Sequence, residues 1–176
     1  MISYKKIIIG LIYTAISLNG PLLLAESRFE ATKKNIDIPD LTFMNESRLD
    51  KISNYRGKVV LLNLWATWCA PCVQEMPALE NLASLYPEAD FKIIALSQDK
   101  GGLSVIQNFY KVNKINKLAI YYDQDNKLSN FLSVRGLPSS YLISKKGKIV
   151  ARLEGSSSWN NENIKQIIIN EILKKD

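Results

Sequence analysis

The chain has 176 residues, of which 47% are hydrophobic and 23% charged, and its formal net charge at neutral pH is +6. This composition fits one globular domain with its own core and a short additional segment. Apart from two short lysine clusters the positive charge is scattered, so we interpret it as solvated surface rather than a nucleic-acid site. The chain has two cysteines and no histidine. These counts exclude a four-ligand zinc site and the histidine base of most serine and cysteine hydrolases.

The first 25 residues have the pattern of an export signal. Lys5 and Lys6 precede an apolar stretch over residues 7–18, a Gly-Pro breaker follows, and Ala25 ends the segment with a small residue. The apolar stretch would span about 18 Å as a helix, less than a hydrocarbon core of about 30 Å. Leu23 is larger than a cleavage site favours, so a cleaved signal peptide and a retained membrane anchor both stay open. Either one predicts a periplasmic or other extracytoplasmic domain, secreted or held at the inner membrane, where disulfides persist.

Strands and helices alternate along the rest of the chain. A polar lead-in is expected over residues 26–35, followed by a domain over residues 36–176 that opens with an extended edge segment. Apolar runs predict buried strands at 59–65, 91–96 and 118–122, and a hairpin at 140–143 and 148–153. Helical spacing predicts helices that begin near Pro71, at a Ser104–Gln107 capping box, near Asp125, and at Asn160 or Asn161. This order predicts an α/β fold with a mixed central sheet and helices on both faces.

The cysteine pair Cys69 and Cys72 carries the chemistry that the sequence suggests. The pair follows a buried strand and begins a helix, so its spacing brings both side chains to one face, close enough for a disulfide. Free backbone N–H groups and the helix dipole favour a thiolate at Cys69 more than at Cys72. We therefore expect an exposed Cys69 to attack a substrate disulfide and a more buried Cys72 to resolve the mixed disulfide. We expect no metal and no cofactor other than this redox-active disulfide.

The residues around the pair resemble a known family. The stretch Trp65-Ala66-Thr67-Trp68-Cys69-Ala70-Pro71-Cys72 is similar to the active site of thioredoxin-fold proteins, and Arg135-Gly136-Leu137-Pro138-Ser139 resembles their second signature. More narrowly, Asn63, Glu75 and Pro77 resemble the TlpA/ResA-like branch, as does the long separation between the two signatures. The resemblance covers nearly the whole predicted domain. It implies a thioredoxin-like three-layer sandwich.

The resemblance also implies which residues meet the substrate. The Leu137–Pro138 bond would be cis, and the backbone of Leu137 would then pair with an extended substrate segment. Trp68 would shield the disulfide, although a tryptophan beside a strand end is often simply part of the core. We expect Trp65 to be core.

Proton transfer and redox tuning are assigned to four further residues. Asn63 stands where thioredoxins place a buried aspartate, and an amide cannot accept a proton. Glu75, one helical step beyond Cys72, would take over that role with its pKa raised by desolvation; the alternative is a solvated helix residue. Ala70 and Pro71, between the cysteines, supply no donor that would stabilise the dithiol, so the pair should act as a reductant.

These observations together predict an exported thiol-disulfide oxidoreductase that reduces protein disulfides. The resemblance implies narrow substrates, with apocytochrome c haem-site cysteines first and copper-site proteins second, and a membrane thiol reductase as electron donor. A Cu(I)-binding module that uses the same two thiolates is the alternative, although Trp68 and Pro71 argue against a dedicated copper carrier. An inert disulfide is a third possibility, but so short a loop gains little stability from closure.

Overall fold

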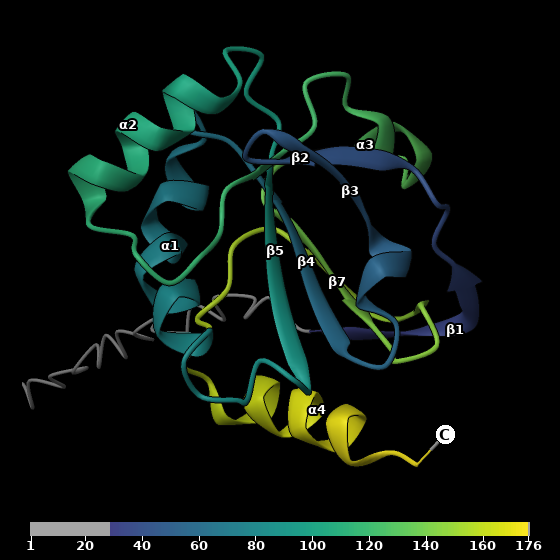
Figure 1. Cartoon of the computed structure of the whole chain (residues 1–176). Helices are drawn as coiled ribbons and strands as arrows, with labels where there is room; N and C mark the ends of the chain where they lie inside the picture. The colour runs from purple at the N-terminus through teal and green to yellow at the C-terminus, as the bar shows by residue number, and fades with distance from the viewer. Residues whose placement is uncertain (1–28, 176) are drawn as a thin grey trace, which may run out of the picture.

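An eight-stranded mixed sheet runs through the molecule in a computed structural model that describes residues 29–175 (Figure 1). The strands, in chain order, are β1 (Glu30–Asp37), β2 (Thr42–Asn45), β3 (Arg48–Lys51), β4 (Val59–Trp65), β5 (Phe91–Ser97), β6 (Tyr121–Tyr122), β7 (Ser139–Ile143) and β8 (Lys148–Glu154). The helices over these residues are α1 (Ala70–Leu82), α2 (Leu103–Asn113), α3 (Lys127–Phe131) and α4 (Glu162–Leu173), with a short 3-10 turn at Ile52–Tyr55. Across the sheet the order is β1-β8-β7-β4-β5-β6-β2-β3.

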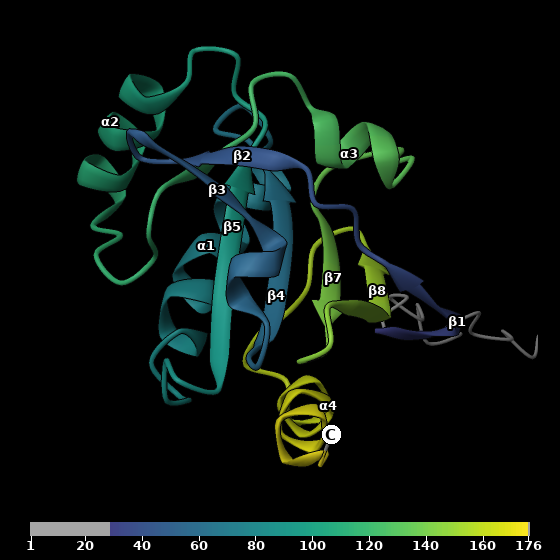
Figure 2. The same ribbon diagram turned by 45° about the vertical axis from the view of Figure 1, so that its right-hand side comes forward.

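Strand β4 forms the centre of the sheet and of the core. It pairs in parallel with β5 and antiparallel with β7, and every one of its residues is buried. Because side chains alternate along a strand, Leu61 and Trp65 enter one buried cluster while Leu62 and Leu64 enter the other. The first cluster takes its helical residues from α1, α2 and α4, and the second from α3, on the other side of the sheet (Figure 2). The expected sandwich with helices on both faces is therefore confirmed.

Most elements lie where the sequence predicted them. The two central strands and the β7–β8 hairpin are present. Helix α4 begins after Asn161, whose side chain accepts a hydrogen bond from the Asn163 N–H at 2.8 Å. Among the helices of residues 29–175, none has the length and apolar character needed to cross a membrane. The predicted signal peptide or anchor over residues 1–25 lies outside the described residues.

The N-terminal boundary of the fold differs from the expectation. Strand β1 begins at Glu30, inside the segment expected to be a polar lead-in, and pairs antiparallel with β8, with Ala31 opposite Ala151. An edge strand has one open side and needs few apolar residues, so its composition gave no strand signal. Strands β2 and β3 form a further hairpin that the sequence pattern did not reveal.

Two other local expectations are wrong. Strand β6 covers only Tyr121–Tyr122 and not the expected residues 118–122. The stretch before it lies against α1, where the backbone N–H groups of residues 116–118 donate to the Glu80 carboxylate. Helix α2 begins after Gly102, with no side-chain capping bond, so Ser104 lies inside the helix and forms no capping box with Gln107.

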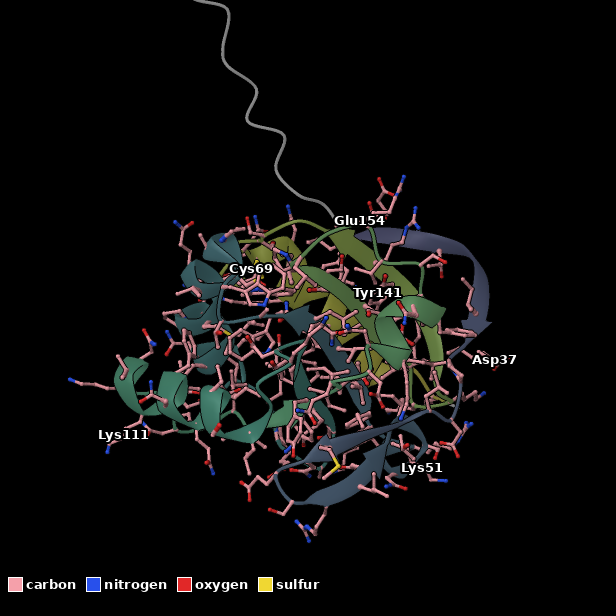
Figure 3. All side chains as sticks on the ribbon, turned by 90° about the horizontal axis from the view of Figure 1, so that it is seen from above. Asp37, Lys51, Cys69, Lys111, Tyr141 and Glu154 are labelled. Carbon is pink, nitrogen blue, oxygen red and sulfur yellow. A yellow bond between two sulfur atoms is a disulfide. The ribbon has the colours of Figure 1, made fainter. Side chains whose placement is uncertain are left out.

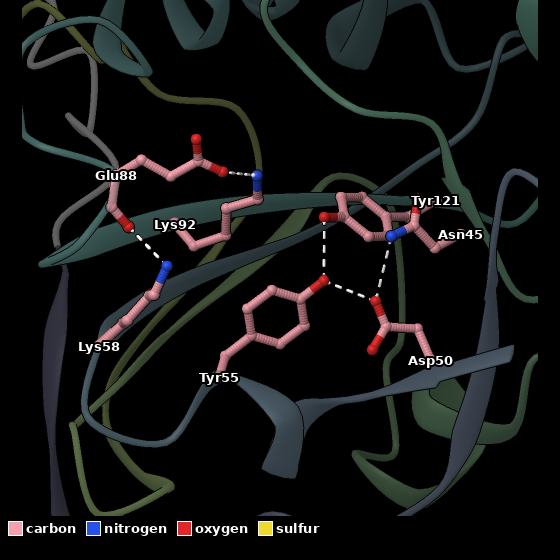
Figure 4. A network of polar contacts seen from close by, with 7 residues as sticks. All are labelled: Asn45, Asp50, Tyr55, Lys58, Glu88, Lys92 and Tyr121. Atoms are coloured by element: carbon pink, nitrogen blue, oxygen red, sulfur yellow. Dashed lines mark hydrogen bonds and ion pairs between the residues drawn. The ribbon is translucent and has the colours of Figure 1, made fainter. Parts of the chain in front are cut away.

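The β2–β3 hairpin is tied to the sheet by a network around Asp50 (Figure 4). The Asp50 carboxylate accepts four hydrogen bonds, from the Asn45 side chain at 3.2 Å, the Lys51 N–H at 2.8 Å, the Asn54 side chain at 2.8 Å and the Tyr55 hydroxyl at 2.6 Å. The Tyr55 hydroxyl also lies 3.0 Å from the Tyr121 hydroxyl. Hairpin, 3-10 turn and β6 are thus joined through one buried carboxylate.

Candidate active site

The cysteine pair lies where β4 ends and α1 begins. Cys69 and Cys72 form a disulfide, with their Cα atoms 5.3 Å apart. Cys69 caps α1, and its Sγ accepts a hydrogen bond from the Cys72 N–H at 3.3 Å. Pro71 occupies the first turn, where its missing N–H costs no helical hydrogen bond. After reduction, the N-terminal end of the helix dipole would favour a thiolate at Cys69.

The two sulfur-bearing side chains differ in burial less than expected. Cys69 is 6% exposed and Cys72 is 0% exposed, so Cys69 is the more accessible but is itself buried in the disulfide state. Figure 3 shows Cys69 near one edge of the molecule when seen from above. Of the two cysteines, Cys69 alone retains exposed surface, so it is the one that a reaction partner can reach.

Trp68, the neighbour of Cys69 in the chain, and Leu137 of the second signature reach the protein surface. Trp68 is 71% exposed, which excludes the core interpretation for it, whereas Trp65 is fully buried as expected. The Leu137–Pro138 peptide bond is cis, in agreement with the resemblance. Trp68 and Leu137 both line a hollow of about 770 Å³. Of the three residues expected to contact substrate, Trp68 and Leu137 therefore meet at this hollow, and Pro138 is not part of its lining.

Glu75 lies inside the protein, on the face of α1 that also carries Cys72. It is 4% exposed, which excludes the solvated-helix alternative. Its Oε1 accepts a hydrogen bond from Asn63 Nδ2 at 2.8 Å, and its Oε2 accepts one from the Ser157 N–H at 3.0 Å. The same Asn63 Nδ2 donates to Ser140 Oγ at 3.0 Å. The amide of β4 and the carboxyl of α1 therefore meet directly.

Burial decides the protonation behaviour of Glu75. Desolvation raises the pKa of this carboxyl, and the hydrogen bonds from Ser157 and Asn63 and the nearby Trp159 indole offset that rise only in part. The buried atoms Asn63 Oδ1 and Trp159 Nε1 have no partner of good hydrogen-bond geometry among the described residues. Incompletely paired polar groups are uncommon in protein cores. A carboxyl in such surroundings is suited to exchanging a proton.

Sequence reasoning missed the residue that holds the loop before the cysteines. Asp99 is 4% exposed and accepts hydrogen bonds from the Thr67 N–H at 2.9 Å, the Thr67 hydroxyl at 2.7 Å and the Ser97 hydroxyl at 2.7 Å. The signal was available, because Asp99 follows the β5 strand, whose end lies beside that of β4, with Trp65 opposite Ser97. Polar residues at neighbouring carboxyl ends of parallel strands converge on one site. Asp99 thereby positions Thr67 and, through it, Trp68.

A mixed sheet that carries a disulfide at the start of its first long helix, next to a cis-proline loop, defines a redox protein of thioredoxin fold. The family model described as Redoxin matches residues 33–168. The thiol-disulfide oxidoreductase ResA of Bacillus thuringiensis subsp. konkukian is 33% identical over 135 residues, which are 76% of this chain and 75% of that protein. The ResA of Bacillus cereus strain ZK is 37% identical over 113 residues, 64% of each chain. The chain therefore belongs to the Redoxin family, within its TlpA/ResA-like thiol-disulfide oxidoreductases.

Solved structures agree with this assignment. The pneumococcal exposed lipoprotein thioredoxin Etrx1 of Streptococcus pneumoniae superposes with a TM-score of 0.65 at 25% identity, covering 75% of this chain and 99% of that one. StoA of Bacillus subtilis has the same fold, with a TM-score of 0.60 at 22% identity, covering 73% of this chain and 97% of that one. These solved chains contain little beyond the matched part.

Proposed function

We propose that the chain reduces disulfides of exported proteins, with Cys69 as nucleophile and Cys72 as resolving thiol. The Cys69 thiolate attacks one sulfur of a substrate disulfide, forms a mixed disulfide and releases the other substrate sulfur as a thiolate. The Cys72 thiolate then attacks the Cys69 sulfur and releases the second substrate sulfur. The substrate gains two electrons and, once its thiolates are protonated, two protons. The observation that carries the proposal is the Cys69–Cys72 disulfide at the N-terminus of α1.

In this proposal Glu75 handles the proton of Cys72. Resolution requires the Cys72 thiol to ionise, yet Cys72 is fully buried and lies one step further from the positive end of the helix. Glu75 follows it at helical spacing, and its raised pKa brings the carboxyl closer to the pH at which the thiol must ionise. Asn63, with its amide, positions the carboxyl but takes no proton.

The residues between the cysteines favour the reducing direction. Ala70 and Pro71 provide no side-chain donor that would stabilise a thiolate, so the dithiol gives up its electrons more readily than in a strong oxidant. Each turnover consumes two electrons. Outside the cytoplasm a membrane thiol reductase would resupply them.

The proposed place of action and the proposed substrates rest on the sequence and on the resemblance. Export is supported by the signal pattern of residues 1–25 and by the description of one solved relative as an exposed lipoprotein. The preferred substrates are the haem-site cysteines of apocytochrome c, followed by the cysteines of copper-site proteins. The Cu(I)-binding alternative uses the same pair without electron transfer.

The reduction potential of the pair tests the proposal. Residues 26–176 are equilibrated with glutathione or dithiothreitol buffers, and the Cys72→Ser variant provides the baseline without a disulfide. A reversible two-electron couple near or below about −230 mV supports a reductase. A value near about −120 mV makes the protein a disulfide donor and overturns the direction of transfer. The absence of any reversible couple overturns the oxidoreductase function and favours Cu(I) binding.

A further inference from the structure

The hollow beside Trp68, which we call the Trp68 groove, continues the active site. Its apolar wall consists of Trp68, Val105, Val134 and Leu137. Trp68 and Val105 are 71% and 39% exposed, so this apolar surface faces solvent. Because Trp68 is bonded to Cys69, a polypeptide whose disulfide reaches the Cys69 sulfur places its neighbouring residues beside this groove. The occupant that fits is an extended segment of the substrate.

The charges that line the groove are unbalanced. Lys100 and Arg135 both border it. Lys100 forms no ion pair with a carboxylate of residues 29–175, and Arg135 contacts both carboxylate oxygens of the exposed Glu154, at 3.4 and 3.5 Å. Asp99 also borders the groove and accepts hydrogen bonds from Thr67 and Ser97. Two cationic side chains and one carboxylate therefore line the groove, an excess of one positive charge that favours an acidic occupant.

Two groove residues have spare hydrogen-bond acceptors. The side-chain amide oxygens of Gln98 and Asn126 are buried and have no donor among the described residues. Gln98 is only 7% exposed, so water does not readily reach it. An extended polypeptide carries backbone N–H groups of the kind that these two oxygens lack as donors. This second observation indicates a polypeptide occupant rather than an apolar small molecule.

We propose that the Trp68 groove selects disulfides flanked by an apolar residue and an acidic residue, with Lys100 and Arg135 as specificity-determining residues. The apolar side chain packs on Trp68 and Val105, and the carboxylate pairs with the two cations. This inference rests on the proposed reductase function and narrows its substrates to acidic, locally extended segments.

The test uses three disulfide peptides that differ only beside one cysteine, where leucine is followed by aspartate, asparagine or lysine. Pre-reduced protein is mixed with each peptide, and the second-order rate constant is measured. The aspartate peptide should react fastest and the lysine peptide slowest, with about a five- to tenfold difference for two exposed charge pairs. Added salt should shrink the difference. Equal rates for the three peptides would overturn the inference.

Charge reversal provides the matched comparison. The double variant Lys100→Glu/Arg135→Glu should invert the order and favour the lysine peptide. Lys111→Glu, on the exposed outer side of α2 (Figure 3), changes the net charge but should leave the order as it is. If Lys111→Glu shifts the order as much as the double variant does, general electrostatics and not the groove decides the preference.

A small neutral disulfide separates this inference from the proposed function. Wild type and Lys111→Glu should reduce hydroxyethyl disulfide at the same rate. For the double variant, each peptide rate is divided by its own rate with this neutral disulfide, so that a change in the reactivity of Cys69 itself cancels. Failure of the wild type to reduce it would contradict the reductase function itself. Normal reduction of this disulfide without any charge preference among the peptides would contradict the groove inference alone.

Discussion

Asp50 and Glu75 are both buried carboxyl groups, but they differ in the number of donors around them. Asp50 accepts four hydrogen bonds, whereas Glu75 accepts one from Asn63 and one from Ser157. Burial acts to raise both pKa values. At Asp50 the hydrogen bonds outweigh burial and the pKa lies below its usual range, whereas at Glu75 burial prevails and the pKa is raised.

The difference separates a carboxyl that holds the fold from one suited to chemistry. The Asp50 network joins a hairpin to the sheet, and Figure 3 shows its neighbour Lys51 on the opposite side of the molecule from Cys69. Glu75 follows Cys72 on the same helix and borders two buried polar atoms without partners. Full pairing fixes the charged state of Asp50, and incomplete pairing leaves Glu75 able to change its state.

Asp50→Asn should have the largest effect on stability. In the variant, the side-chain NH2 would replace one of the two acceptor oxygens and would face groups that are themselves hydrogen-bond donors. The free energy of unfolding should therefore fall by about 2 to 3 kcal/mol. Urea denaturation measures this loss. The rate of thiol exchange in the folded variant should stay unchanged. Asp37→Asn is the control, because Asp37 is exposed and pairs only with Lys148; a loss as large as that of Asp50→Asn would contradict the role of the network.

Asn63→Asp should destabilise the surroundings of Glu75, the other carboxyl of the comparison. It replaces the amide that lies 2.8 Å from Glu75 by a second carboxyl. Two buried carboxylates repel, so the free energy of unfolding at neutral pH should fall by about 2 kcal/mol. The pair can share one proton at lower pH, so much of this loss should disappear near pH 5. Denaturation at both pH values tests this. If the free energy of unfolding fell equally at both pH values, the loss would come from the missing hydrogen bond to Ser140 and not from repulsion between carboxylates.

Local features of the site could be predicted from the sequence, and distant partners could not. The positions of Cys69 and Cys72 and the helical face of Glu75 depend on residues within one turn of each other. The Ser157 donor to Glu75 lies 82 residues away, in the segment between β8 and α4, where no pattern marks it. The solvated alternative for Glu75 stayed open for this reason. Only the tertiary fold decides burial.

The same limit applied to the sheet. The buried strand β4 has an unbroken apolar run and could be recognised from it. Strand β1 pairs with β8 more than 100 residues away, as the hydrogen bond from Thr32 to the Ile149 carbonyl shows. The Asp50 network likewise depends on Tyr121, 66 residues from Tyr55. Polar residues that pair over such distances leave no periodic signal.

Glu75→Gln should slow the resolution of the mixed disulfide. Glutamine has the shape of glutamate but cannot take the Cys72 proton, so the rate at neutral pH should fall about tenfold, at the low end of acid–base effects because thiols ionise readily. The measurement is the rate of resolution between pH 5 and pH 9. Wild type should show an inflection from Glu75 that the variant lacks. Asp50→Asn should retain the wild-type profile, and an unchanged profile in Glu75→Gln would leave that carboxyl without a role in proton transfer.

The smallest effect expected is on how stability depends on pH. The pKa of Glu75 is higher in the folded protein than in the unfolded chain, where a glutamate has a pKa of about 4.3. Folded Glu75 therefore binds its proton more tightly. Wild-type stability is therefore favoured below that value and declines as the pH rises through the folded pKa. Glutamine does not titrate, so Glu75→Gln should become more stable relative to wild type over this interval, by about 1 kcal/mol or less.

Asp50 should give the opposite sign. Because the pKa of folded Asp50 is lowered, this group stabilises the protein at pH values above the unfolded aspartate pKa of about 3.9, and this stability is lost as the pH falls through the folded pKa. The stability difference between wild type and Asp50→Asn should therefore shrink only in acid. Denaturation midpoints of both variants and wild type from pH 3 to pH 7 test the two signs together. If the stability differences of both variants from wild type changed in the same direction with pH, the number of hydrogen-bond donors would not explain why the two carboxyl pKa values shift in opposite directions.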